Sequence, residues 1–187
     1  MDDISQHDFT ETTVESRTVY RGNLLHVKED DIRLPDGRLA RREYVEHPGA
    51  VIIIAELADG RVLLERQFRY PLRRHMIELP AGKIEPREDP LVTAQRELLE
   101  ETGYAAADWR LLAEVHPCVG YSDERIVYFL AGGLTHHGSR LDEGEFLQVL
   151  EISLDAALAW VDQGRISDIK TIAGLYWLQR LRNAPSA

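Results

Sequence analysis

The sequence predicts an α+β (α/β) sandwich, because short strand patterns alternate with helix patterns along its 187 residues. Apolar residues make up 44% and charged residues 29% of the chain, close to the average for globular proteins. A chain of this length buries a core without metal or disulfide staples. Cys118 is its single cysteine, which excludes an internal disulfide and a cysteine-based zinc site.

Residues 1–47 are predicted to form a small antiparallel β unit. Apolar and polar side chains alternate over residues 17–46, and the turn signal Pro35-Asp36-Gly37 separates two of these runs. A unit of this size is too small for an independent core. We therefore expect it to form a homodimer by exchanging strands across a two-fold axis, with residues 48–187 as the main domain.

The main domain begins with two predicted strands joined by a hairpin. Residues 50–55 are a short apolar run typical of a buried strand, and the turn Asp59-Gly60 leads into a second strand over 61–68. Residues 69–89 contain three prolines and are predicted to be rich in loops. Further strands are expected near residues 110–116, 125–131 and 146–152.

Three helices are predicted from the residues at their ends. Asp89 is suited to cap the first helix, Pro90 fits its first turn, and Gly103 fits the position just past its end. The second and third helices are expected over residues 154–163 and 167–182, where apolar side chains recur at helical spacing.

The net charge of the chain is −10, from 22 basic and 32 acidic residues. An acidic protein is a poor general ligand for nucleic acid or anionic membranes, which require a positive surface. It can still bind a small anion through local cations or a metal ion. The N-terminal stretch lacks the pattern of a signal or transit peptide, and no apolar run approaches the ~20 residues of a membrane span. We therefore expect a cytoplasmic protein.

The first predicted helix carries three glutamates on one face. Glu97, Glu100 and Glu101 have the spacing i, i+3, i+4, which places like charges side by side. Oxygen ligands without cysteine or paired histidine favour Mg²⁺ or Mn²⁺ over zinc. Because Mg²⁺ shares its coordination with substrate phosphates, the cluster indicates phosphoryl chemistry. The alternative is an acidic helix face that only contacts solvent.

The residues around this cluster resemble the Nudix box, G-x5-E-x7-R-E-U-x-E-E-x-G-U, where U is a bulky apolar residue. The matching positions are Gly82, Glu88, Arg96, Glu97, Leu98, Glu100, Glu101, Gly103 and Tyr104. The resemblance implies the Nudix fold, a mixed β-sheet sandwiched between helices, and hydrolysis of a nucleoside diphosphate linked to another moiety. Segments 67–71, 78–82, 120–124 and 142–146 are similar to those of ADP-ribose and nucleotide-sugar pyrophosphatases.

The resemblance also implies a metal site that holds Mg²⁺, with Mn²⁺ as a substitute. The implied ligands are the backbone carbonyl of Ala81 and the carboxylates of Glu97 and Glu101, with Glu100 sharing or supporting. Arg96 is expected to orient a glutamate by ion pairing. A structural ion pair between Arg96 and Glu88 is an equally compatible alternative.

The catalytic base implied by the resemblance lies in the acidic loop over residues 138–145. Glu143 is the best match and Glu145 is the second candidate. Gly138 and Gly144 allow the loop to move, as gating loops require. A solvated loop carboxylate is the alternative for Glu143.

Four residues are implied to bind substrate: Arg69, Arg42, Glu124 and Glu78. Arg69 is expected to clamp the diphosphate, because a guanidinium suits phosphate oxygens. Arg42 is expected to reach the nucleotide of the partner subunit, or else to be an exposed strand arginine, and Glu124 to line the sugar or metal side. Family members commonly carry a Ser-Pro-Gly turn where this chain has Cys118-Val119-Gly120, so recognition of the terminal sugar stays open.

The resemblance therefore implies a Mg²⁺-dependent pyrophosphatase that splits ADP-ribose into AMP and ribose 5-phosphate. One alternative is a pyrophosphatase for another nucleotide sugar, such as GDP-mannose. Another is a non-catalytic, Nudix-like domain that senses a nucleotide. The complete box argues against such a sensor, and neither nucleic acid nor a membrane is expected as a partner.

Overall fold

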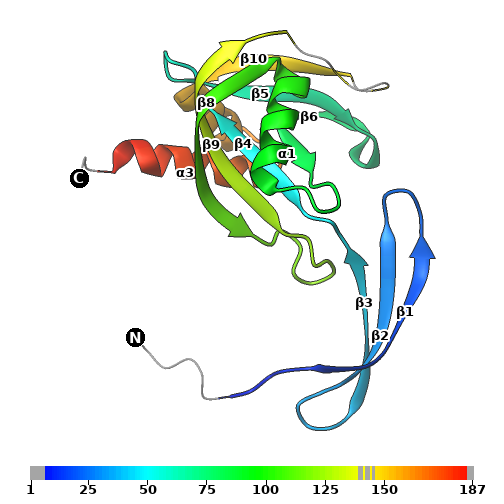
Figure 1. Cartoon of the computed structure of the whole chain (residues 1–187). Helices are drawn as coiled ribbons and strands as arrows, with labels where there is room; N and C mark the ends of the chain where they lie inside the picture. Colours follow the sequence, from blue (N-terminus) through cyan, green and yellow to red (C-terminus); the bar gives the residue numbers. More distant parts are fainter. Residues whose placement is uncertain (1–6, 139–140, 142–143, 145, 185–187) are drawn as a thin grey trace. The chain divides into compact units, whose positions relative to one another are not determined.

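The computed structural model describes residues 7–138, 141, 144 and 146–184 (Figure 1). The chain divides into two compact units. One consists of Met1–His47 and Cys118–Glu124, and the other of Pro48–Pro117 and Arg125–Ala187. Within the described part of the chain, none of the helices combines the length and apolar character of a membrane span.

The first unit is a three-stranded antiparallel sheet, which confirms the predicted N-terminal β unit. Its strands are β1 (Thr12–Arg21), β2 (His26–Arg33) and β3 (Leu39–Glu46), in the order β1-β2-β3. The segment Cys118–Glu124 joins this unit through the end of β3, where Val45 N donates to Tyr121 O at 2.8 Å. The sequence analysis had assigned that segment to the main domain.

The second unit contains two sheets. A mixed sheet has the order β7-β4-β9-β8, in which β4 and β9 run parallel and the other pairs antiparallel. An antiparallel sheet has the order β10-β5-β6. The strands are β4 (Ala50–Ala55), β5 (Arg61–Arg69), β6 (Arg74–Glu78), β7 (Ala81–Lys83), β8 (Tyr104–Val115), β9 (Ile126–His136) and β10 (Leu147–Ser153).

The helices of this unit are α1 (Pro90–Glu97), α2 (Leu154–Asp162) and α3 (Ile169–Asn183). Each begins after a residue whose side chain accepts a hydrogen bond from a backbone N–H of the first turn, as expected of an N-cap. The caps are Asp89, Ser153 and Asp168. The predicted start of the third helix, residue 167, was too early because Asp168 is the cap.

The central strand β4 explains why helices cover both faces of its sheet. Val51 and Ile53 are fully buried in one cluster with Ala94 of α1. Ile52 and Ile54, which point the other way along the strand, pack against buried residues of α2 and α3. A run of apolar residues with no polar alternation is what a strand buried on both faces requires. The predicted mixed sheet between helices is confirmed (Figure 1).

Residues 69–89, predicted to be rich in loops, also contain regular elements that the sequence did not predict. The segment contains a 3₁₀ turn, η1 (Tyr70–Leu72), followed by β6 and β7. β6 forms by antiparallel pairing with β5, and the three residues of β7 pair with β4. Such pairings depend on distant neighbours, which local sequence patterns do not report.

Candidate active site

The three glutamates that the sequence predicts on one helix face belong to two different helical segments. Glu97 is the last residue of α1, whereas Glu100 and Glu101 lie in a π-helical turn, η2 (Leu98–Thr102). In a π turn the hydrogen bonds reach five residues along the chain, and such turns are frequent at functional sites. Gly103 ends the turn with a φ of 75°. The sequence predicted one regular helix, so the wider turn is a difference found in the structure.

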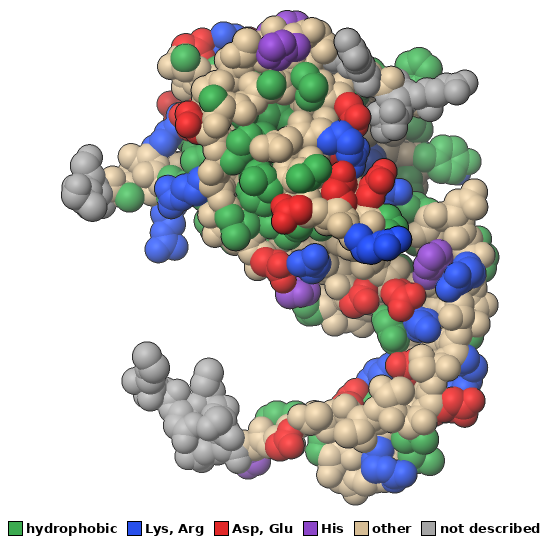
Figure 2. Space-filling view, in the orientation of Figure 1, with side chains coloured by type: hydrophobic (Ala, Val, Ile, Leu, Met, Phe, Trp, Pro, Cys, Tyr) green, Lys and Arg blue, Asp and Glu red, His purple; other side chains and the backbone are tan. Residues whose placement is uncertain are grey.

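Arg96 contacts three carboxylates at once. Its Nη1 lies 2.9 Å from Glu97 Oε1 and 3.0 Å from Glu100 Oε2, and its Nη2 lies 3.3 Å from Glu88 Oε2. Both contacts considered from the sequence, with the cluster and with Glu88, are therefore present together. Figure 2 shows acidic and basic side chains interleaved on the face of this unit that carries α1.

This network shifts the protonation equilibria of its members. Partial burial opposes the charge on Arg96, but hydrogen bonds to Glu88 and the carboxylates of Glu97 and Glu100 outweigh burial and raise the pKa of Arg96. Hydrogen bonds from Thr93 and Arg96 lower the pKa of Glu88. Both shifts favour the charged forms of Arg96 and Glu88.

The strand β7 brings its backbone against two of the glutamates. Ala81 N donates to Glu101 Oε2 at 3.2 Å, and Glu101 is only 7% exposed. At Gly82, a Cβ would lie 2.1 Å from the carboxyl group of Glu97. Ala81, which precedes the box, and Gly82, its first residue, therefore lie beside Glu101 and Glu97, two of the predicted metal ligands.

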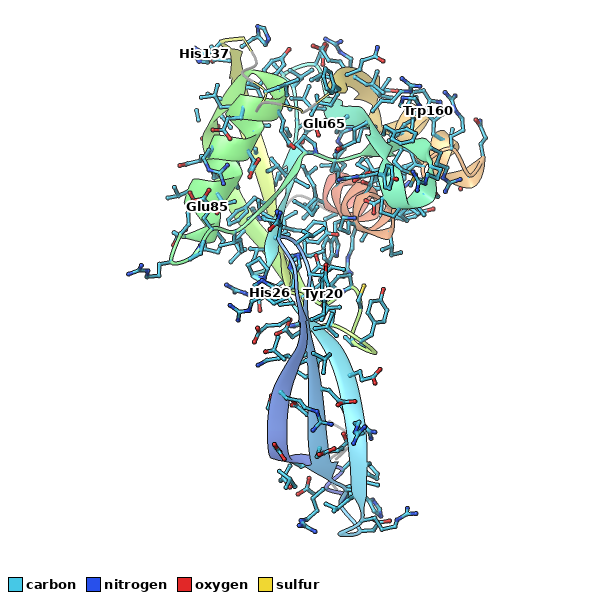
Figure 3. The ribbon with its side chains drawn as sticks, turned by 90° about the vertical axis from the view of Figure 1, so that its right-hand side faces the viewer. Tyr20, His26, Glu65, Glu85, His137 and Trp160 are labelled. Carbon is cyan, nitrogen blue, oxygen red and sulfur yellow. The ribbon has the colours of Figure 1, made fainter. Side chains whose placement is uncertain are left out.

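Arg69 and Glu78 form a bidentate ion pair between β5 and β6. Arg69 Nε and Nη2 donate to the two oxygens of Glu78 at 2.8 and 2.7 Å, and the hydrogen bonds to Glu78 raise the pKa of Arg69. Glu78 is nearly fully buried. Its cross-strand neighbour Glu65 is also fully buried in the interior of this unit (Figure 3). The sequence did not single out Glu65, which is followed directly by the polar residues Arg66 and Gln67.

A cavity of about 310 Å³ opens beside Glu101. Its lining residues are Gln67, Phe68, Glu101, Gly144, Phe146 and Leu147. Phe68 and Phe146 are both exposed and supply apolar lining to the cavity, as aromatic side chains commonly do in ligand-binding clefts. Phe68 and Phe146 fall within segments 67–71 and 142–146, for which the resemblance implied no role of these two side chains.

The other predicted site residues lie in the first unit or outside the described residues. Arg42 lies in the first unit, where it forms an ion pair with Glu11. Glu124 belongs to the same unit, and its Oε1 lies 3.9 Å from His47 Nδ1. The candidate bases Glu143 and Glu145 lie outside the described residues.

The donor set at this site contains only oxygen atoms, which suits a hard divalent cation. Among the described residues, however, no three Asp, Glu, His or Cys side chains converge in a metal-binding cluster. The contacts explain this, because Arg96 holds Glu97 and Glu100, while Glu101 accepts a hydrogen bond from Ala81 N. A cation would compete with Arg96 for these carboxylates.

Comparison with known proteins extends over nearly the whole chain. The model of the NUDIX domain matches residues 46–173, and that of the nucleoside diphosphate sugar hydrolase N-terminal domain matches residues 11–45. The methanol dehydrogenase activator of Bacillus methanolicus is 39% identical over 173 residues, which are 91% of this chain and 94% of that protein. The ADP-ribose pyrophosphatase of Bacillus subtilis (strain 168) is 38% identical over 171 residues, 90% of this chain and 92% of that protein.

The fold also has a close counterpart among solved structures. The crystal structure of an ADP compounds hydrolase superposes with a TM-score of 0.83, covering 94% of this chain and 96% of that one at 22% sequence identity. This match supports the fold, whereas the domain model and the relatives, which cover most of this sequence, support the family. The chain belongs to the Nudix family of hydrolases.

Proposed function

We propose that this chain hydrolyses the diphosphate bond of ADP-ribose to AMP and ribose 5-phosphate. The proposal is supported by the relative from Bacillus subtilis, which is named an ADP-ribose pyrophosphatase. The observation that carries it is the position of Glu101. This buried carboxylate lines the 310 Å³ cavity and accepts a hydrogen bond from Ala81 N. The side chain of Glu101 thus contacts both a cavity of ligand size and the residue whose carbonyl we propose as a metal ligand.

Nudix hydrolases use divalent metal ions, and we propose Mg²⁺ for this chain, with Mn²⁺ as a substitute. The groups proposed to hold the ion are the carbonyl of Ala81 and the carboxylates of Glu97, Glu100 and Glu101. When bound, such an ion neutralises diphosphate charge and lowers the pKa of water.

The side chains of the protein have separate proposed roles. The guanidinium of Arg69 binds diphosphate oxygens, and Arg96 keeps the glutamates oriented while the substrate is bound. Glu143 accepts a proton from the attacking water, whose oxygen bonds to phosphorus as the P–O bond to the leaving phosphate breaks. Glu143→Gln is expected to lower kcat with little change in KM. An unchanged kcat would move this role to Glu145.

Product analysis tests the proposed substrate. The protein is incubated with ADP-ribose, GDP-mannose or a dinucleotide, with Mg²⁺ or with a chelator, and the phosphate products are separated. We expect metal-dependent AMP from ADP-ribose, at a kcat/KM above that for the other substrates. A preference for GDP-mannose would keep the mechanism and replace the substrate. Tight nucleotide binding without any product would contradict the proposal.

We further propose that residues 1–47 form a homodimer by strand exchange and that Arg42 reaches the nucleotide of the partner subunit. The support is that the first sheet leaves four large apolar side chains, Val14, Val19, Tyr20 and Leu39, each 53–66% exposed. Light scattering at micromolar concentration tests the proposal, and a monomer would refute it.

A cytoplasmic location also remains a prediction.

A further inference from the structure

The first turn of α3 binds the segment between β6 and β7. Leu79 N donates to Thr171 Oγ1 at 2.8 Å, and Thr171 is fully buried. Thr171 in turn donates from its hydroxyl to Asp168 Oδ2 at 2.8 Å, while Thr171 N donates to the same oxygen at 2.9 Å. Asp168 thus caps α3 and also orients the Thr171 hydroxyl, which accepts the hydrogen bond from the Leu79 backbone.

The direction of these hydrogen bonds is determined by chemistry. Burial opposes the charge on Asp168, but Lys170 and the hydrogen bonds from Thr171 outweigh it and lower the pKa of Asp168. An ionised carboxylate only accepts hydrogen bonds. The single proton of the Thr171 hydroxyl therefore goes to Asp168, and the oxygen lone pairs remain for Leu79 N–H.

The side chain of Leu79 is held by the same helix. Gly174 lies one turn after Thr171, and a Cβ there would come within 2.5 Å of Leu79 Cδ1. Tyr128 anchors the start of α3 as well, since its hydroxyl donates to Lys170 O at 2.8 Å. The helix therefore approaches Leu79 closely and is itself attached to β9.

The residues that follow Leu79 carry this constraint to the candidate site. Pro80 O accepts from Ile53 N at 2.9 Å, and Ala81 N donates to Glu101 at 3.2 Å. Three consecutive residues are thus bound to α3, to β4 and to the π-helical turn η2. Displacing the first of them would move the carbonyl of Ala81 and its contact with Glu101.

We propose that Thr171, oriented by Asp168, is a positioning residue for the metal site. It fixes Leu79–Ala81 so that the Ala81 carbonyl and the Glu101 carboxylate keep the relative position that a cation requires. The inference rests on the proposed function for its effect on catalysis. Its effect on metal binding and on the Leu79 amide is measurable without any substrate.

Four variants separate positioning from general stability. Thr171→Val keeps the shape of the side chain but leaves the Leu79 N–H without its acceptor, whereas Thr171→Ser keeps the hydroxyl. Asp168→Asn removes the charge that orients Thr171. Ser153→Ala is the matched control, because Ser153 caps α2 by accepting from Ala156 N at 3.3 Å and so tests the loss of a helix cap alone.

Two measurements use the metal-free, full-length protein. Hydrogen exchange at the Leu79 amide is expected to be faster in Thr171→Val than in the original protein. Mn²⁺ binding, followed by electron paramagnetic resonance without substrate, is expected to weaken about tenfold or more, as is typical when an outer partner of a metal site is lost. Thr171→Ser is expected to restore both properties, and Ser153→Ala to leave both unchanged.

A third measurement determines how the activity of the protein depends on the Mg²⁺ concentration. The Mg²⁺ concentration for half-maximal activity is expected to rise in Thr171→Val, with a smaller change in KM for substrate. The proposal would be overturned if Thr171→Val bound Mn²⁺ as tightly as the original protein. It would also be overturned if Ser153→Ala lost as much Mn²⁺ affinity as Thr171→Val.

Two further results have a defined meaning. If Thr171→Val does not fold, Asp168→Asn replaces it, and undiminished Mn²⁺ affinity in that variant overturns the proposal. If the original protein hydrolyses no substrate, the proposed function fails, while Mn²⁺ affinity and Leu79 exchange still decide the role of Thr171.

Discussion

The backbone of Gly82 lies directly against the carboxyl group of Glu97. A Cβ on residue 82 would be 2.1 Å from Cγ, Cδ and Oε1 of Glu97, closer than any real non-bonded contact. The φ of Gly82 is not among the positive values that glycine adopts in this structure. The requirement for glycine is therefore steric, and it concerns the carboxylate that we propose as a metal ligand.

Gly82→Ala is expected to inactivate the protein more than it destabilises it. Glu97 can rotate away from the new methyl group, so the free energy of unfolding should fall by only about 1 kcal/mol, while the displaced carboxylate lowers kcat. Thermal unfolding and kcat measured on the same preparation check this. The matched control is Gly132→Ala, where the nearest atom to a new Cβ is 3.9 Å away. A Gly82→Ala protein with unchanged kcat would contradict the steric argument.

Glu101→Gln is expected to fold normally and to lose most of its activity. The amide oxygen can still accept from Ala81 N, but the charge proposed to bind the cation is gone. Metal-ion stabilisation is worth several kcal/mol, and each 1.36 kcal/mol is tenfold in rate, so kcat should fall about 100-fold or more. Glu97→Gln should behave alike. The control is Glu114→Gln, which removes an exposed carboxylate paired with Arg125. Activity near that of the control would refute the metal assignment.

Arg69→Lys tests the bidentate pair with Glu78. A lysine has no planar fork and cannot make both hydrogen bonds. The buried Glu78 therefore loses one hydrogen bond, and the free energy of unfolding should fall by about 1–2 kcal/mol. If Arg69 also binds diphosphate, KM should rise while kcat changes less. Denaturant unfolding and steady-state kinetics measure the two effects. Arg125→Lys, at an exposed pair, is the control, and a stability loss equal to that control would argue against a special role for the buried pair.

The stability of the protein is expected to fall when Asp168 is protonated. Its pKa is lowered in the folded state, so its contribution is present above the unfolded pKa of about 3.9 and is lost as the pH falls through the folded value. Lys170 and Arg69 are the cations that act on it, and the buried Tyr128 hydroxyl is close enough to be affected. Unfolding free energies measured between pH 7 and pH 3 should decline less in Asp168→Asn than in the original protein. Parallel curves would exclude this contribution.

The sequence alone determined the features that depend on near neighbours. Asp89 and Gly103 mark the ends of the glutamate-bearing helical segment, because a cap acts within one turn. The apolar run over residues 50–55 predicted a buried strand, and β4 has those bounds. The spacing of Glu97 and Glu100 predicted that they share a face, and both carboxylates contact Arg96.

Only the tertiary structure decided which distant groups meet. Leu79 and Thr171 are 92 positions apart, and their hydrogen bond exists because α3 packs closely against the sheet at Gly174. The ion pair of Arg69 with Glu78 required β6, a strand that the sequence did not predict. Long-range contacts follow from the faces that elements bury against each other, and a local pattern specifies the apolar face of an element but not its partner.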